Sequence, residues 1–491
     1  MLSTNKSTSN KQLVFYFVIL VAIYITPILL TSRPYIDDLG RIINGNTGWS
    51  ENGRPLADLI MRLMSLGKPL VDLSPLNQIL SVIALCTSIY FYTLKNFTDI
   101  NRYGALIASF LFISNPFYIE NLSYKYDSLP MALSMVMLLL PFILSLKGIV
   151  YHITTIIFII ASLSLYQAAI GLFPILVILD IITKKHSIGN KKITISIIPH
   201  IVNLIIAFIL YKLFIANPLV DGEYNIAHSE TLALSLSSVS ILLDNIKSTK
   251  WLLDSYLSSF PLIFKILFAL AIIYSISKEI YCLFSKAIKK NIISSFVIIL
   301  SPILVLALAL TPLLTLKFPV IAPRVMLSTS GVFLLYTYLI FRNIKPTTIK
   351  AILLFPIVWM SIVYSYSYSS STRSQQNLDD LISKSIYQNV LLTGKEFRYV
   401  NISGEMPKSS QLLIARTKLP LMEKLIPIYM SNDWIWGAIL LNHYGFNLEY
   451  KNLGNERNNL MCSSHIISKN QTYNLYYKDD ILFIDFNKIK C

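Results

Sequence analysis

Long runs without charged residues dominate this sequence and restrict the folds that are open to it. A helix needs about 20 apolar residues to cross the hydrocarbon core of a membrane. Only helices or closed barrels satisfy every backbone polar group in lipid, and a barrel would show short alternating strands. The uncharged stretches here are long and unbroken, which predicts membrane-spanning helices. They are residues 12–32, 73–94, 103–119, 128–146, 148–179, 193–211, 291–316, 325–341 and 351–372.

Composition excludes the soluble alternatives. Apolar residues make up 54% of the 491-residue chain and charged residues only 14%, whereas about a quarter of a soluble domain is charged. This excludes a soluble enzyme, a disordered chain and a coiled coil. Residues 148–179 are long enough for two short helices that break near Tyr166 and Gln167, and another span fits residues 257–277. We therefore predict a polytopic α-helical membrane protein with about 11 transmembrane helices.

The placement of basic residues predicts the orientation of these spans. The chain has 42 Lys and Arg against 26 Asp and Glu, a net charge of +16, and cytoplasmic loops are enriched in Lys and Arg. With a cytoplasmic N-terminus, every basic cluster falls on the cytoplasmic side. The basic excess is thus a membrane-orientation signal, and we expect no nucleic-acid partner.

Composition changes near residue 371, where charges return. Residues 1–370 are predicted to form the transmembrane domain and residues 371–491 a small α+β domain, which an odd number of spans places outside. A helix is expected at 378–390, a strand at 397–402, and a hairpin from 472–477 and 481–486. Cys462 and Cys491 both fall in this domain, and an oxidising outer compartment would permit a disulfide between them.

Two adjacent acids follow the first span. Asp37 and Asp38 lie in the first outer loop, residues 33–75, near a membrane boundary where charge is costly unless it is hydrated, paired or functional. They are either a functional pair or solvated loop acids paired with Arg33 and Arg41.

Further polar residues gather on the same predicted outer face. Loop hydration and an interfacial aromatic belt are the structural alternatives for them, and a lysine within a span can snorkel to the interface. Carboxylates ringed by cations nevertheless suit one reaction class, in which a carboxylate takes a proton from an acceptor hydroxyl while cations hold a phosphate leaving group. The residues concerned are Arg54, Glu120, Tyr126, Asp127, Tyr166, Gln167, Lys265 and Arg324.

Four short motifs carry a resemblance to a known family. They are residues 35–38 (YIDD), 52–56 (NGRPL), 120–127 (ENLSYKYD) and 164–167 (SLYQ). In order and spacing over roughly the first 340 residues, the chain resembles the serotype-converting O-antigen glucosyltransferases of the type II kind, encoded by phages and bacteria. The resemblance implies the GT-C class of polytopic glycosyltransferases, in the bacterial inner (cytoplasmic) membrane. Such enzymes move glucose from undecaprenyl-phosphate glucose to a sugar hydroxyl of lipid-linked O-antigen, on the periplasmic face, and so modify lipopolysaccharide.

The resemblance also implies roles for individual residues. Because the catalytic acid of GT-C enzymes lies just after the first span, one of Asp37 and Asp38 is expected to be the general base. Phosphate is a good leaving group, so one base suffices, and direct displacement would invert the anomeric centre. Adjacent acids are compatible with a divalent cation but do not require one, and no metal ligands are assigned. Charge and placement make Arg54, Arg324 and Lys265 the candidates for the donor phosphate. The residues expected to orient the acceptor or brace the loops are Glu120, Tyr126, Asp127, Tyr166 and Gln167.

Two other classes of function remain as alternatives. A transporter or flippase for lipid-linked sugars would use charges inside the membrane as a substrate path, but the spans are nearly free of charge and no internal repeat is visible. A non-catalytic assembly subunit would leave the paired acids dispensable. We expect a glycosyltransferase.

Overall fold

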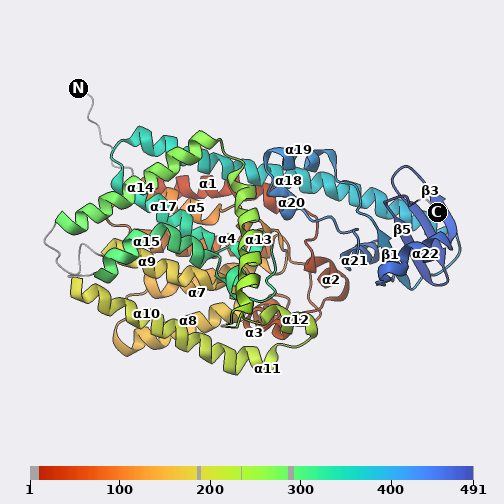
Figure 1. Cartoon of the computed structure of the whole chain (residues 1–491), viewed down its shortest axis with the longest axis horizontal. Helices are drawn as coiled ribbons and strands as arrows, with labels where there is room; N and C mark the ends of the chain where they lie inside the picture. Colours follow the sequence, from red (N-terminus) through yellow and green to blue (C-terminus); the bar gives the residue numbers. More distant parts are fainter. Residues whose placement is uncertain (1–9, 185–189, 234, 286–291, 490–491) are drawn as a thin grey trace. The chain divides into compact units, whose positions relative to one another are not determined.

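The computed structural model describes residues 10–184, 190–233, 235–285 and 292–489 (Figure 1). The chain divides into two compact units. The first consists of Met1–Leu29, Thr47–Gly67 and Leu73–Tyr366, and the second of Leu30–Asn46, Lys68–Asp72 and Ser367–Cys491. The segment that carries the two adjacent acids therefore folds with the C-terminal part of the chain.

The first unit is built of helices. Helix α4 packs against α5 and α7, α7 packs against α8, and α17 packs against α5 and α14. Helix α7 is buried along most of its length, whereas α10 and α14 leave large apolar side chains exposed, among them Ile205, Phe208 and Leu270. Exposed apolar faces of this kind suit contact with lipid. The main helices are α1 (Asn10–Leu29), α3 (Pro55–Met64), α4 (Leu76–Asn96), α5 (Arg102–Ile113), α6 (Tyr118–Ser123), α7 (Ser128–Ile143), α8 (Gly148–Leu165), α9 (Leu172–Lys184), α10 (Asn190–Tyr211), α13 (Ser237–Leu257), α14 (Leu262–Ser285), α15 (Ile292–Ala309) and α17 (Thr329–Asn343).

Several of these helices are long and apolar enough to cross a membrane. Within the described residues there are six, or seven if the bent pair α13–α14 counts as one span, together with three shorter apolar helices in α5, α7 and α15. A helical membrane protein is thus confirmed, but the predicted count of about 11 spans is not. Uncharged stretches and helices differ in extent. For example, α5 ends at Ile113, before Pro116, although its uncharged stretch runs to residue 119.

Two local predictions about the spans have different outcomes. The break near Tyr166 is confirmed, because α8 ends at Leu165 and a short 3₁₀ helix, η2 (Gln167–Gly171), precedes α9. The span expected at 257–277 begins later than predicted, since α13 and α14 meet at a bend of 108° between Leu257 and Leu262. Lys265 therefore lies in the first turn of α14, close to the bend.

Helix α18 (Thr347–Leu391) is 45 residues long. At 1.5 Å per residue it measures about 67 Å, roughly twice the thickness of the hydrocarbon core. Its first residues belong to the first unit and those from Ser367 onward to the second. The helix predicted at 378–390 is its last part.

The second unit contains a five-stranded mixed sheet in the order β2-β1-β5-β4-β3. The predicted strand and hairpin are confirmed as β1 and as the antiparallel pair β4–β5, which is joined at Asp479-Asp480. Cys462 ends α22, and Cys491 lies outside the described residues, so the disulfide between them stays a prediction. The strands are β1 (Tyr399–Ser403), β2 (Glu449–Tyr450), β3 (His465–Lys469), β4 (Asn474–Lys478) and β5 (Ile481–Asp485), and the main helices are α2 (Asp37–Asn44), α19 (Ser410–Lys418), α21 (Trp436–His443) and α22 (Arg457–Cys462).

Candidate functional site

In the first unit, Gln167 links three segments that are far apart in the sequence. Its side-chain oxygen accepts a hydrogen bond from Nε of Arg54 at 2.7 Å. Its amide nitrogen donates to the carbonyl of Asn52 at 2.8 Å and to the hydroxyl of Tyr211 at 2.9 Å. The break after α8 thus orients one amide so that it holds the start of α3 and the end of α10 together.

The turn before α3 fixes the position of Arg54. Gly53 has φ +71, and a Cβ added there would lie 2.8 Å from the hydroxyl of Tyr211, which donates to the Gly53 carbonyl at 2.8 Å. The Arg54 guanidinium lies 4.7 Å from the centre of the Tyr166 ring. Among the described residues, no carboxylate lies within ion-pair distance of Arg54, so its hydrogen-bond and ring partners are neutral.

Arg324 has a charged partner. Its side chain donates to one carboxylate oxygen of Glu120 at 2.6 Å, and its backbone N–H donates to the other oxygen at 2.8 Å. Glu120 is 1% exposed and the Arg324 side chain 20%. The carbonyl of Arg324 accepts hydrogen bonds from Asn121 at 3.1 Å and Tyr166 at 3.4 Å. This pair joins α6 to the 3₁₀ helix η4 (Pro323–Met326).

Asp127 lies at the start of α7 and is also engaged. The indole Nε1 of Trp49 donates to its carboxylate at 2.5 Å, and both side chains are buried. Tyr126, the preceding residue, is buried as well. The predicted residues of the turn between α6 and α7 are therefore packed inside the protein, not solvated in a loop.

Four of the predicted residues interact electrostatically with the hydroxyl of Tyr166. Burial raises the pKa of its hydroxyl to about 12; Arg324 and Arg54 oppose this, and Glu120 and Asp127 add to it. The structure thus brings two cations and two carboxylates around one aromatic side chain, which we call the Tyr166 cluster. Glu120 offsets the charge of Arg324, which leaves Arg54 as the cation held by neutral groups.

Lys265 is not joined to the Tyr166 cluster by any hydrogen bond or ion pair of the described residues. Its backbone N–H bonds to the carbonyl of Pro261 at the start of α14, and its side chain is partly exposed. A role at the donor phosphate stays a prediction for this residue.

The two adjacent acids lie in the second unit, at the start of α2. The backbone N–H of Asp38 donates to the carbonyl of Tyr35 at 3.0 Å, and the Asp38 carboxylate accepts the N–H of Tyr35 at 3.1 Å. Asp38 is fully buried, whereas Asp37 is partly exposed. Ile36 between them and Tyr35 has φ 43 and ψ −103, a conformation that a β-branched residue adopts only under strain.

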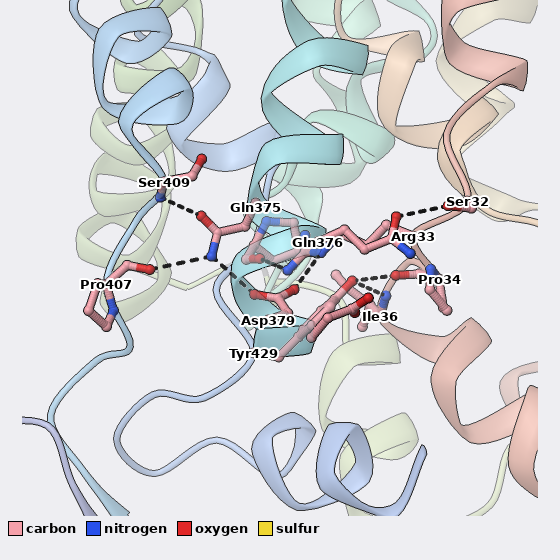
Figure 2. A network of polar contacts seen from close by, with 12 residues as sticks. Ser32, Arg33, Pro34, Ile36, Gln375, Gln376, Asp379, Pro407, Ser409 and Tyr429 are labelled. Carbon is pink, nitrogen blue, oxygen red and sulfur yellow. Dashed lines mark hydrogen bonds and ion pairs between the residues drawn. The ribbon is translucent and has the colours of Figure 1, made fainter. Parts of the chain in front are cut away.

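Arg33 does not form its ion pair with these acids. Its Nε donates to Asp379 of α18 at 2.8 Å, with both side chains nearly fully buried, and its terminal nitrogen donates to the carbonyl of Pro427 at 2.7 Å. The guanidinium also lies 4.2 Å from the centre of the Tyr429 ring. Figure 2 shows this network: Asp379 and Tyr429 lie beside the Arg33–Pro34 segment, and Gln375 donates to the Asp379 carboxylate from its other side. The alternative in which Arg33 neutralises the acid pair is therefore wrong.

A cavity of about 130 Å³ lies beside this network in the second unit. Asp380, His443 and Tyr444 line it together with Leu39 of α2 and the Arg33–Asp379 pair. Within the parts of the chain that the structure describes, no group of three or more His, Cys, Asp or Glu side chains is placed to hold a metal ion.

Sequence reasoning missed several residues that complete these arrangements. Trp49 is close to Arg54 in sequence, but nothing in the pattern marked it as a donor to Asp127. Tyr211, Asp379 and Tyr429 are separated from their partners by 44, 346 and 393 residues. Separations of this size leave no local sequence signal.

Comparisons with known proteins identify the family. Residues 26–335 match the model of a family described as glucosyl transferase GtrII. A protein of Salmonella phage P22, described as an uncharacterized 55.3 kDa protein in the gtrB 5′ region, is 30% identical over 459 residues, which cover 91% of this chain and 93% of the relative. No solved structure matches the chain. The match to a transferase family does not favour the transporter alternative. The family match implies a glycosyltransferase with a sugar donor and a glycan acceptor, and the apolar helices indicate a membrane protein. The chain belongs to the GtrII glucosyl transferase family.

Proposed function

We propose that this chain transfers glucose from undecaprenyl-phosphate glucose to a sugar hydroxyl of lipid-linked O-antigen, on the periplasmic face of the bacterial inner membrane. The observation that carries the donor assignment is that the partners of the Arg54 guanidinium among the described residues, the Gln167 amide and the Tyr166 ring, are neutral. A guanidinium held by a neutral amide and an aromatic ring keeps its full charge for an incoming anion, and its planar fork matches a phosphate. A polyprenyl phosphate presents such an anion at the membrane surface.

The other cations take different roles in this proposal. Arg324 is already neutralised by Glu120, so it contributes mainly by holding α6 against η4 and by its field at Tyr166. Asp127 braces the turn before α7 through Trp49. Tyr126 is buried within the same turn, and Lys265 is a secondary candidate for the donor phosphate.

Asp37 is the proposed general base. It is partly exposed, whereas the Asp38 carboxylate is buried and bonded to the Tyr35 N–H of its own turn. In the reaction, the Asp37 carboxylate takes the proton of the acceptor hydroxyl while that oxygen bonds to C1 of glucose. The bond between C1 and the phosphate oxygen breaks, and undecaprenyl phosphate leaves with the electron pair. Attack opposite the leaving group inverts C1.

The experiment that tests this proposal is complementation in an O-antigen-bearing strain that lacks the enzyme. Asp37→Asn is expected to abolish glucosylation, because an amide cannot accept the proton. Asp38→Asn is expected to retain part of it, because an amide oxygen still accepts the Tyr35 N–H. Asp244→Asn is the matched control, since that side chain is 72% exposed on α13. Full glucosylation of the polysaccharide by Asp37→Asn, at a normal protein level, would refute the assignment of the base.

A further inference from the structure

The turn that leads into the two acids is strained. Residues 35–38 form a tight turn closed by the hydrogen bond from the Asp38 N–H to the Tyr35 carbonyl. Ile36 occupies its second position with φ 43 and ψ −103, which is near the mirror image of a type II turn and normally requires glycine. A residue held in such a conformation costs about 1–3 kcal/mol and persists only where the surroundings enforce it. Something other than the local sequence must therefore hold this turn.

Tyr429, in the C-terminal part of the chain, forms hydrogen bonds to the backbone of this turn at Pro34 and at Ile36. The Tyr429 hydroxyl donates to the carbonyl of Pro34 at 2.7 Å and accepts the N–H of Ile36 at 3.1 Å. Tyr429 is fully buried, and burial raises the pKa of its hydroxyl above the ordinary value, with Arg33 and the Ile36 N–H opposing. The hydroxyl therefore keeps its proton at neutral pH and can make both bonds.

Tyr429 is itself held in place. The Arg33 guanidinium lies on its ring and is fixed by Asp379 and by the carbonyl of Pro427, two residues before Tyr429 (Figure 2). Gln375, one helical turn from Asp379 on α18, donates to the Asp379 carboxylate at 3.0 Å and accepts the N–H of Ser409 at 2.8 Å. A buried ion pair and a hydroxyl thus tie the 33–38 segment to α18 and to the loop at 427–429.

We propose that Tyr429, held by the buried Arg33–Asp379 pair, is a positioning residue that fixes the strained turn at residues 35–38 and thereby sets the place of the Asp37 carboxylate. The inference rests on the proposed function, because it takes Asp37 as the general base. It gives the C-terminal part of the chain a role in the reaction: it enforces the geometry of a loop that comes directly after the first helix. Tyr429 acts through the backbone of Ile36 and touches no substrate in this role.

Tyr429→Phe tests the inference, because it removes one hydroxyl and leaves the ring under Arg33. Amide hydrogen exchange of the peptide covering residues 34–39 is expected to rise, since the Ile36 N–H loses its acceptor. The kcat for glucose transfer is expected to fall about 10- to 100-fold, because small displacements of a reacting group cost this much, while KM for the donor stays within about twofold. Tyr473→Phe is the matched control: it removes a hydroxyl, bonded to Ser385 at 2.6 Å, from another buried tyrosine of the same unit.

Three results would refute this inference, and a fourth would refute the proposed function instead. Unchanged exchange at residues 34–39 in Tyr429→Phe would refute the clamp, whatever the activity. Raised exchange with wild-type kcat would refute the positioning role, and an equal fall in kcat for Tyr473→Phe would reduce it to a general effect of lost hydroxyls. Full activity of Asp37→Asn alone would instead refute the proposed base.

Discussion

Arg54 and Arg324 are both arginines of the Tyr166 cluster, and exchanging each for glutamine is expected to damage the protein in different ways. Arg54 has neutral partners, so Arg54→Gln leaves no buried charge unpaired and the fold should persist. The loss falls on the donor phosphate instead. Removing one hydrogen-bond donor from an oxyanion hole typically costs about 2.7–4 kcal/mol of transition-state stabilisation, and we expect a similar 10²- to 10³-fold fall in kcat here.

Arg324→Gln should act on stability first. It leaves Glu120, which is 1% exposed, without its guanidinium partner. Removing one partner of a buried ion pair costs about 3–5 kcal/mol, and the 20% exposure of the Arg324 side chain argues for the lower end, about 3 kcal/mol. The double variant Glu120→Gln/Arg324→Gln removes both charges and is expected to regain most of the stability, because two amides can still bond to each other.

The assay for these variants combines thermal unfolding of the purified full-length protein, followed by tryptophan fluorescence, with initial rates of transfer from undecaprenyl-phosphate glucose. Arg398→Gln is the matched control, because Arg398 is 65% exposed and its partner Glu449, at 3.7 Å, is 64% exposed, so the change leaves no buried carboxylate unpaired. Wild-type rates for Arg54→Gln would refute the donor assignment. A stable Arg324→Gln variant, or a double variant that is no more stable than it, would refute the reasoning about the ion pair.

Three further changes have expected outcomes. Ile36→Gly should raise the midpoint of thermal unfolding, because glycine adopts φ 43 without strain, and lower kcat through a looser turn; a lower midpoint would contradict the strain. Gly53→Ala should lower the midpoint by the equivalent of about 1–2 kcal/mol, because Gly53 has φ +71 and the added Cβ would lie 2.8 Å from the Tyr211 hydroxyl. Adding Tyr211→Phe to this variant should restore part of the lost stability. If neither change alters the midpoint, the close contact is refuted. Burial raises the pKa of Glu423, but its hydrogen bonds and opposite charges, those of Arg416 first, lower the pKa below 4.5 overall. The ionised carboxylate therefore stabilises the fold above pH 4.5, and this stabilisation is lost as the pH falls through the lowered pKa. The unfolding midpoint of Glu423→Gln should thus depend less on pH between 3 and 5 than that of the wild type, and an equal dependence would refute the effect.

Much of the fold could be predicted from the sequence, because the signals involved are local. The break at Tyr166 and the hairpin joined at Asp479-Asp480 both depend on a few neighbouring residues. The number of spans could not be predicted in the same way. An uncharged stretch states where charge is absent but not where a helix bends, as the turn between α13 and α14 shows.

The sequence predicted which residues belong to the candidate site, but not which of their side chains pair with one another. Composition and motif selected Arg54, Glu120, Asp127 and Arg324, but the pairing of Glu120 with Arg324 spans 204 residues and has no local signature. One of the two alternatives for the acids paired them with Arg33, and this pairing is wrong for a related reason. Neighbouring acids are the obvious partners in sequence, whereas in the fold α18 brings Asp379 to the guanidinium.

The most direct test of the central claim is transfer by the purified full-length protein in liposomes that contain O-antigen acceptor. Radiolabelled glucose is supplied in parallel reactions as undecaprenyl-phosphate glucose or as a nucleotide-diphosphate glucose, and label in the polysaccharide is measured for the wild type and Asp37→Asn. We expect transfer from the lipid-linked donor only, with inversion at C1, and none by Asp37→Asn. Transfer from the nucleotide sugar, or undiminished transfer by Asp37→Asn, would contradict the account.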